Sequence, residues 1–236
     1  MISVCMATFN GERFIDEQLD SILPQLSDKD EIVISDDSST DSTVKRIKKR
    51  NDPRIVIFEN QKFRNPIQNF ENAIKNSSGD LIFLADQDDV WEGSKIQKMK
   101  ENLEDHDLVL CDCALTDSEL NVLIPSYFKK YKSSKGFFRN LKKNSYIGSC
   151  LAFNRKIKHL ALPFPKNIPM HDYWIGMTAE IFGNVCFLNE PLVLHRIHEK
   201  NVSQTGSKSR HHIFSKITFR FNLLFSLFML LLFKKS

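Results

Sequence analysis

The sequence contains three carboxylates within four residues, and this group is its clearest chemical feature. Asp86, Asp88 and Asp89 directly follow the apolar run 80–85, with Gln87 among them. Carboxylates this close repel one another, which destabilises the segment unless cations neutralise them. Their oxygens are hard ligands of the kind that Mg²⁺ and Mn²⁺ prefer. Residues 86–89, called the acidic loop below, therefore predict a divalent cation site in which phosphates share the metal.

Two further polar groups follow apolar runs earlier in the chain. The run 31–35 ends at Asp36 and Asp37, and the run 2–8 ends at a Thr-Phe-Asn-Gly sequence. Ligands of open parallel sheets bind at the carboxyl ends of the strands. We therefore expect these groups to share one site with the acidic loop. Taken alone, the Asp pair is equally typical of a helix N-cap.

The patterns of the two commonest phosphate-binding loops are missing from this sequence. Neither G-x-x-x-x-G-K-[ST] nor G-x-G-x-x-G follows the first apolar run. This argues against a P-loop NTPase and against a dinucleotide-dependent dehydrogenase. A site that holds a nucleotide diphosphate through carboxylates and a bridging metal agrees with the pattern.

The elements that must position these groups alternate between strand and helix. The first half predicts strands at 2–8, 31–35, 54–58 and 80–85, separated by helices at 15–26, near 41–50 and at 66–78. The strands are apolar throughout rather than alternating, which is typical of parallel strands covered on both faces. We expect one α/β domain with a doubly wound, mostly parallel sheet and helices on both faces.

Further elements are predicted in the second half. Strands are expected at 108–113, 146–153, 185–188 and 192–195, and a helix at 170–182. The basic, aromatic stretch 127–143 gives no assignment. Because the chain of 236 residues is 42% hydrophobic, it can bury a full core. Its five cysteines form no C-x-x-C pair, so a reducing compartment is expected.

The end of the chain differs from the rest in charge and hydropathy. Residues 199–236 hold seven Lys or Arg and one acid, a net +6, whereas the first 198 residues sum to −2. The apolar run 223–233 spans about 16 Å as a helix, too short for a hydrocarbon core of about 30 Å. We expect a catalytic domain at 1–205 and a basic, apolar segment at 206–236 that lies on a membrane surface. A short insertion, a packed helix or a dimer contact are the alternatives.

Five segments of the chain resemble glycosyltransferase family 2, and they occur in the family's order. They are residues 4–11 (VCMATFNG), 32–41 (IVISDDSSTD), 79–91 (GDLIFLADQDDVW), 170–174 (MHDYW) and 195–203 (HRIHEKNVS). The resemblance implies a GT-A fold and inverting transfer of a sugar from a nucleotide-diphosphate sugar.

The resemblance also implies roles for particular residues. The donor would be contacted by Thr8, Asn10, Glu12, Asp36, Asp86 and Gln87. Asp88, with Asp86 and His198, would hold Mg²⁺ or Mn²⁺, and Asp172 would be the general base. A base is required because an acceptor hydroxyl has a pKa far above 7.

Each of these roles has a plainer alternative. Asp172, taken alone, is more typical of a helix N-cap, and His195 competes with His198 for the metal. The acidic loop is also compatible with a solvated turn.

The predicted function is an inverting, metal-dependent glycosyltransferase of cell-surface polysaccharide synthesis, peripheral on the cytoplasmic face of the membrane. The D-Q-D-D-V-W and H-D-Y-W forms resemble rhamnosyltransferase-like members, which implies a dTDP-sugar donor, and a UDP-sugar is the equally compatible alternative. The acceptor is expected to be a saccharide or a lipid-linked saccharide, and no nucleic acid partner is expected. The alternatives are a sugar-phosphate nucleotidyltransferase, whose usual Gly-rich loop is absent, and a non-catalytic saccharide-binding protein of the same fold.

Overall fold

The computed structural model describes residues 1–198 and 213–233. Its first half alternates strand and helix as predicted, in the order β1 (Ile2–Thr8), α1 (Ile15–Ile22), the 3-10 turn η1 (Leu23–Gln25), β2 (Glu31–Asp36), α2 (Thr43–Lys49), β3 (Ile55–Phe58), α3 (Pro66–Asn76) and β4 (Leu81–Asp86). These strands pair in parallel in the order β3-β2-β1-β4. The register places Thr8 beside Asp36 and Ala7 beside Asp86, so the polar groups that follow the strands meet at one sheet edge.

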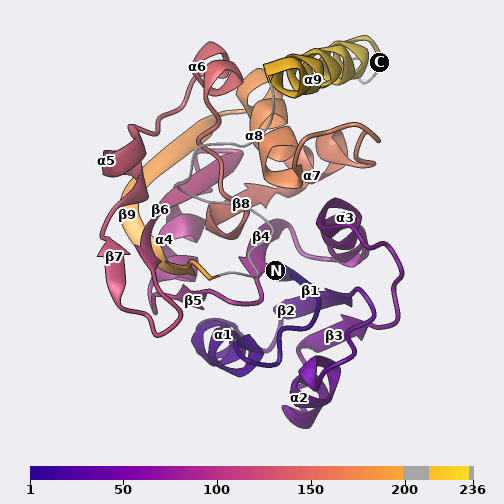
Figure 1. The fold of residues 1–236 in the computed structure, drawn as a ribbon, viewed down its shortest axis with the longest axis vertical. Helices are drawn as coiled ribbons and strands as arrows, with labels where there is room; N and C mark the ends of the chain where they lie inside the picture. Colours follow the sequence, from indigo (N-terminus) through magenta and orange to yellow (C-terminus); the bar gives the residue numbers. More distant parts are fainter. Residues whose placement is uncertain (199–212, 234–236) are drawn as a thin grey trace.

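The second half extends the same sheet with strands of both directions. Its elements are β5 (Val90–Trp91), α4 (Lys95–Asn102), β6 (Leu108–Thr116), β7 (Val122–Ile124), α5 (Tyr127–Tyr131), α6 (Phe137–Lys142), the 3-10 turn η2 (Gly148–Cys150), β8 (Leu151–Asn154), α7 (Arg155–Ala161), α8 (His171–Phe182), β9 (Val185–Arg196) and α9 (Ile213–Phe233). β8 runs antiparallel between β4 and β6, whereas β9 runs parallel to β6 and also pairs with β5. Over the described residues the sheet has nine strands, in the order β3-β2-β1-β4-β8-β6-β9-β5 with β7 beside β6 (Figure 1).

The predicted α/β class is confirmed, and several boundaries differ from the sequence expectation. The strand expected over 146–153 begins only at Leu151, because η2 precedes it. The strands expected at 185–188 and 192–195 are one strand, β9, whose register against β6 shifts near Asp112. The unassigned stretch 127–143 contains α5 and α6, and α4 and α7 are additional helices.

The core lies on both sides of the central strands. All nine residues of β6 are buried, which is unusual for a strand and reflects its position inside the sheet. α9 packs against the rest of the fold through Leu223 and Leu227, both buried. No helix within residues 1–198 and 213–233 is long and apolar enough to span a membrane. The predicted domain boundary at 205 and residues 199–203 of the HRIHEKNVS segment lie outside the described residues.

Candidate active site

Thr8 and Asp36 meet at the ends of β1 and β2. The Thr8 Oγ1 hydroxyl donates to Asp36 Oδ2 at 2.8 Å, and both side chains are buried. The backbone N–H of Ser39 donates to Asp36 Oδ1 at 2.8 Å. The Asp36 carboxylate therefore closes the turn after β2. The N-cap residue of α2 is Ser42, so neither Asp36 nor Asp37 has the predicted capping role.

Asn10 and Glu12 bind the loop that precedes α2. Asn10 Oδ1 accepts from the Thr40 N–H at 2.8 Å, and Glu12 Oε2 accepts from the Ser42 N–H at 2.9 Å. Asn10 has a φ of 49°, which Asn tolerates better than most residues. Both side chains thus fix the wall of the site beside Thr8.

Gln87 joins the acidic loop to the end of β1. Its Oε1 accepts from the Phe9 N–H at 2.9 Å and its Nε2 donates to the Phe9 carbonyl at 3.1 Å. A Cβ at Gly11 would lie 2.3 Å from Gln87 Oε1, so the glycine makes room for this contact. The Phe9 ring, which sequence reasoning did not single out, is 55% exposed at this edge.

The acidic loop is more buried than a solvated turn. Asp89 is fully buried, Asp88 is nearly so, and Asp86 is partly buried. Burial, followed by the charges of Asp89 and Asp88, raises the pKa of Asp86 well above its usual value. The solvated-turn alternative therefore does not describe this loop.

Two histidines from the end of β9 pair with the acidic loop. His195 Nδ1 lies 3.0 Å from Asp89 Oδ2, and His198 Nε2 lies 2.8 Å from Asp88 Oδ2. Burial opposes protonation of His195, but the Asp89 charge and hydrogen bond outweigh it and raise the pKa of His195 to about 9. His195 and Asp89 therefore form a buried ion pair at neutral pH. His198 and Asp88 form a second, more accessible pair.

The donor set fits a divalent cation. Ligand atoms of Asp86, Asp89 and His195 lie within 4.8 Å of one another, although His195 would have to give up the proton of its Asp89 ion pair before it could bind a cation. Asp89 also accepts from the Arg196 N–H at 3.1 Å, so this carboxylate is largely satisfied by protein donors. The neighbouring Asp88 and His198 are more open, with side chains 13% and 14% exposed. Carboxylates with an imidazole suit Mn²⁺, and the carboxylates suit Mg²⁺.

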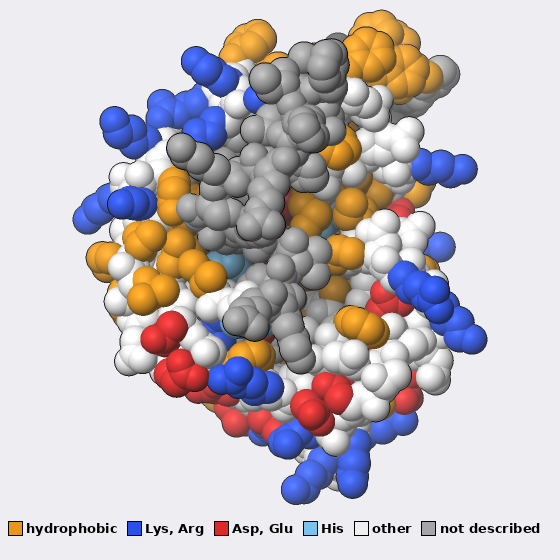
Figure 2. Space-filling model, viewed as in Figure 1, with side chains coloured by type: hydrophobic (Ala, Val, Ile, Leu, Met, Phe, Trp, Pro, Cys, Tyr) orange, Lys and Arg blue, Asp and Glu red, His pale blue; other side chains and the backbone are white. Residues whose placement is uncertain are grey.

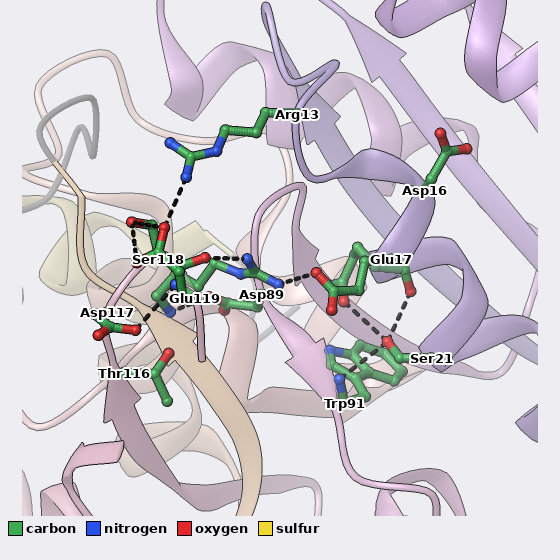
Figure 3. Close-up of polar contacts among 12 residues, drawn as sticks. Arg13, Asp16, Glu17, Ser21, Asp89, Trp91, Thr116, Asp117, Ser118 and Glu119 are labelled. Atoms are coloured by element: carbon green, nitrogen blue, oxygen red, sulfur yellow. Dashed lines mark hydrogen bonds and ion pairs between the residues drawn. The ribbon is translucent and has the colours of Figure 1, made fainter. Parts of the chain in front are cut away.

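Arg196 supports the position of His198 and was not among the residues predicted for the site. Its guanidinium donates to the Ser118 carbonyl at 2.7 Å and pairs with Glu17 of α1, and these two partners are drawn in Figure 3. The guanidinium also lies 4.7 Å from the ring centre of Phe14, which stacks on His198 at 5.0 Å. The Arg between the two histidines was the available sequence signal.

Lys95 is a second residue that the sequence did not reveal. It is fully buried, although it begins α4, and its Nζ donates to the Ser149 carbonyl at 2.6 Å. The ammonium lies 3.5 Å from the ring centre of Trp91. Burial lowers the pKa of Lys95, and the charges of Asp89 and Asp86 act against this effect. Lys95 Nζ is thus held between the Ser149 carbonyl and the Trp91 ring.

Asp172 lies in the first turn of α8, but it is not the N-cap. Met170 occupies the N-cap position, and Asp172 Oδ1 accepts from the Tyr173 N–H at 2.6 Å. Burial raises the pKa of Asp172 to about 6. The Asp172 charge also contributes to the raised pKa of Asp86, which indicates that the two carboxylates are near enough to interact. A carboxylate of raised basicity beside the acidic loop can accept a proton from an attacking hydroxyl.

Solved structures share this fold. The chain superposes on S. aureus TarS 1–349 in complex with UDP-GlcNAc with a TM-score of 0.71 and 19% identity, covering 93% of this chain and 65% of that one. It superposes on glucosyl-3-phosphoglycerate synthase from Mycobacterium tuberculosis, in complex with Mn²⁺ and UDP-glucose, with a TM-score of 0.61 and 17% identity. That match covers 96% of this chain and 79% of the synthase. These likenesses show that the chain has a GT-A-type fold.

The chain belongs to glycosyl transferase family 2, whose family model matches residues 3–160. One relative is the UDP-Glc:alpha-D-GlcNAc-diphosphoundecaprenol beta-1,3-glucosyltransferase WfgD of Escherichia coli. It is 29% identical over 213 residues, which cover 88% of this chain and 81% of the relative. Another is the dTDP-rhamnosyl transferase RfbG of Shigella flexneri, 39% identical over 99 residues, which cover 39% of this chain and 34% of the relative.

Proposed function

We propose that this glycosyltransferase is inverting and metal-dependent, and that it extends a saccharide or lipid-linked saccharide in cell-surface polysaccharide synthesis. The observation that carries the proposal is Asp172 of α8, a carboxylate of raised pKa whose charge also acts on Asp86 of the acidic loop. The family assignment favours this function over a sugar-phosphate nucleotidyltransferase. The intact Asp86, Asp88 and Asp172 disfavour a non-catalytic saccharide-binding protein.

Asp172 acts as the general base in this mechanism. Its carboxylate takes the proton of the acceptor hydroxyl while the hydroxyl oxygen attacks the anomeric carbon of the donor. The diphosphate leaves from the opposite face of the sugar ring, so the anomeric configuration inverts. Because the pKa of Asp172 is about 6, the base is ionised at neutral pH and still more basic than an ordinary aspartate.

The acidic loop and His198 hold the metal in this proposal. Asp88, Asp86 and His198 would hold Mg²⁺ or Mn²⁺, which would supply positive charge to stabilise the leaving diphosphate. Thr8 and Asp36 accept or donate hydrogen bonds at the base and ribose of the donor. Asn10, Glu12 and Gln87 shape the donor site, because each fixes a neighbouring backbone segment.

Two relatives support the choice of substrates. WfgD is named for a UDP-glucose donor and a diphosphoundecaprenol acceptor, and RfbG for a dTDP-rhamnosyl donor. We therefore propose a UDP- or dTDP-sugar donor and favour a lipid-linked acceptor. A lipid-linked acceptor requires the enzyme to work at a membrane, and we propose peripheral attachment at its cytoplasmic face through residues 206–236.

Substitution of the base tests the proposal. Asp172→Asn should retain donor binding, measured by calorimetry with UDP- and dTDP-sugars, and lose transfer by about 10²–10⁴-fold. Asp105→Asn, at an exposed position outside the site, is the matched control and should transfer sugar at the wild-type rate. Transfer by Asp172→Asn near the wild-type rate would place the base elsewhere. The anomeric configuration of the product, read by NMR, tests inversion separately.

A further inference from the structure

Residues 127–143 form a strongly basic part of the surface. This segment, which contains α5 and α6, holds seven Lys or Arg and no acid: Lys129, Lys130, Lys132, Lys135, Arg139, Lys142 and Lys143. All seven are exposed. Phe138 of α6 lies among them and is 82% exposed, which is a large apolar area to leave in water. Neither the donor site nor the base uses this segment.

α9 carries an apolar row on the face that is turned away from the fold. Phe221, Phe225, Phe228 and Leu232 are each more than half exposed. Their spacing of four, three and four residues places them on one side of a helix. The opposite side, with Leu223 and Leu227, is buried against the protein. Folding of the described residues therefore leaves this row uncovered.

A hydrogen-bonded contact joins the two elements. Arg220 of α9 donates from Nε to the Leu141 carbonyl at 3.0 Å and from a terminal nitrogen to the Lys142 carbonyl at 2.7 Å. These carbonyls end α6, where helical partners are lacking, so Arg220 satisfies them. Basic side chains over α5 and α6 and hydrophobic side chains of α9 lie along the same upper edge of the molecule (Figure 2).

We propose that α6 and α9 form one bilayer-contact surface, here called the α6–α9 surface, which binds anionic lipid. It consists of Lys135, Phe138, Arg139 and Lys142 of the α6 region and the apolar row of α9. A bilayer with anionic headgroups offers negative charge and hydrocarbon side by side, which is the chemistry this surface requires. This places part of the membrane contact outside residues 206–236.

Charge favours a bilayer over a second copy of the chain as the occupant. In a two-fold symmetric dimer the same surface patch faces itself. Such a contact through the α6–α9 surface would bring two strongly basic α6 regions together, and their repulsion would oppose it. A lipid headgroup layer attracts the same charges.

The α6–α9 surface is also linked to the helix that carries Asp172. The Tyr173 hydroxyl of α8 donates to the Asn140 carbonyl of α6 at 3.1 Å, and Glu180 of α8 accepts from the Gly136 N–H at 2.7 Å. Contact of α6 with the bilayer thus holds Asp172 at a defined height above the lipid headgroups. This consequence rests on the proposed function, because it applies to an acceptor whose saccharide is attached to a membrane lipid.

Vesicle flotation of the full-length protein tests the surface. The vesicles are phosphatidylcholine with or without phosphatidylglycerol. We expect Lys135→Glu/Lys142→Glu to weaken partitioning onto anionic vesicles by tenfold or more, because each basic residue near such a surface contributes about 1 kcal/mol. Phe225→Ser/Phe228→Ser should weaken it similarly. The matched control is Lys45→Glu/Lys49→Glu on α2, which makes the same charge change at exposed positions at the other end of the molecule (Figure 1) and should bind as wild type.

Three outcomes would overturn the proposal. Wild-type binding by Lys135→Glu/Lys142→Glu would remove α6 from the surface. Equal weakening by the α2 control would indicate attraction by net charge alone. A dimer in light scattering that Phe225→Ser/Phe228→Ser dissociates, without vesicle binding by the wild type, would identify a second copy as the occupant.

Donor chemistry separates this proposal from the proposed function. Hydrolysis of the nucleotide sugar in solution should be the same in the wild type and in all three double variants. If the wild-type protein transfers no sugar but the vesicle results are as expected, the surface stands and the proposed function fails. If the protein transfers sugar to a soluble saccharide but its vesicle binding does not depend on α6, the proposed function stands and the α6–α9 surface fails.

Discussion

At the scale of single residues, His195 in β9 and His198 just after it should have different effects when they are substituted. His195 is 3% exposed and pairs with a fully buried Asp89, whereas His198 pairs with the more open Asp88. We expect His195→Ala to destabilise the protein by about 3–5 kcal/mol, because it leaves the buried Asp89 charge without its partner. We expect His198→Ala to change stability much less and to weaken metal binding. Urea unfolding and Mn²⁺ titration of both variants provide the test. Equal losses of stability in His195→Ala and His198→Ala would contradict the different roles given to the two histidines.

The raised pKa of Asp172 determines the pH dependence of transfer. A carboxyl group with a pKa of about 6 becomes protonated as the pH falls through 6, and the protonated form cannot act as a base. We expect kcat/KM for the acceptor to fall about tenfold per pH unit below pH 6. Rates measured between pH 5 and 8, with donor binding followed at each pH as the control, provide the test. A rate that stays constant down to pH 5 would be incompatible with Asp172 as the base.

Asp88 is the most direct test of the metal. Asp88→Asn keeps the size of the side chain but removes the charge that would ligate the cation. We expect donor hydrolysis and transfer in Mg²⁺ or Mn²⁺ to be abolished, and the rates of wild type and variant in EDTA to be the same. Unchanged turnover by Asp88→Asn in Mn²⁺ would exclude it as a ligand.

The sequence allowed site residues to be named, but it did not allow the contacts between residues to be predicted. Asp86, Asp88, His198 and Asp172 were identified from spacing and family resemblance, and the structure pairs His198 with Asp88. Lys95 and Arg196 could not be identified, because their functions depend on contacts across the fold. Lys95, for example, lies buried against Trp91 and Ser149, and sequence patterns describe exposure poorly for a single lysine in a polar helix.

At the scale of elements, α8 packs unusually closely behind the site. A Cβ at Gly176 would lie 2.5 Å from ring atoms of Tyr146, whose hydroxyl donates to Glu180 at 2.8 Å. We expect Gly176→Ala to destabilise the protein by about 1–3 kcal/mol, because the ring must move. Gly93→Ala is the matched control, since nothing lies within 4 Å of its added methyl group. Thermal unfolding that affects both variants equally would show that packing at α8 is not the cause.

The first half of the chain was predictable at the element scale because its periodicity is strong. Four apolar strands and the helix that begins at residue 66 occur where expected, and the Asn65 side chain accepts from the Ile67 N–H as an N-cap. The second half was less predictable. Pro191 suggests a chain break, but β9 continues through it, opposite the register shift at Asp112. Such a shift depends on the partner strand and has no local sequence signal.

At the scale of the whole molecule, binding of metal and nucleotide should raise the free energy of unfolding and therefore the Tm. A ligand that binds only the folded state at about 100 times its Kd adds about 2.7 kcal/mol, or about 5–10 °C in Tm for a chain of this size. We expect UDP or dTDP with Mn²⁺ to raise the Tm of the wild-type protein by this amount. The same ligands should leave the Tm of the Asp88→Asn variant unchanged. If the nucleotide raises the Tm by the same amount in EDTA, donor binding does not require the metal.

The contact between Arg196 and Glu17 joins residues 179 positions apart, so the site is closed by nearly the last described residue of the catalytic fold. On the ribosome the chain emerges from its N-terminus, and the acidic loop is made more than 100 residues before its two histidines. An unfinished chain therefore has the carboxylates without His195 and His198. The order of synthesis therefore leaves the proposed metal site incomplete until β9 and the residues after it have been made.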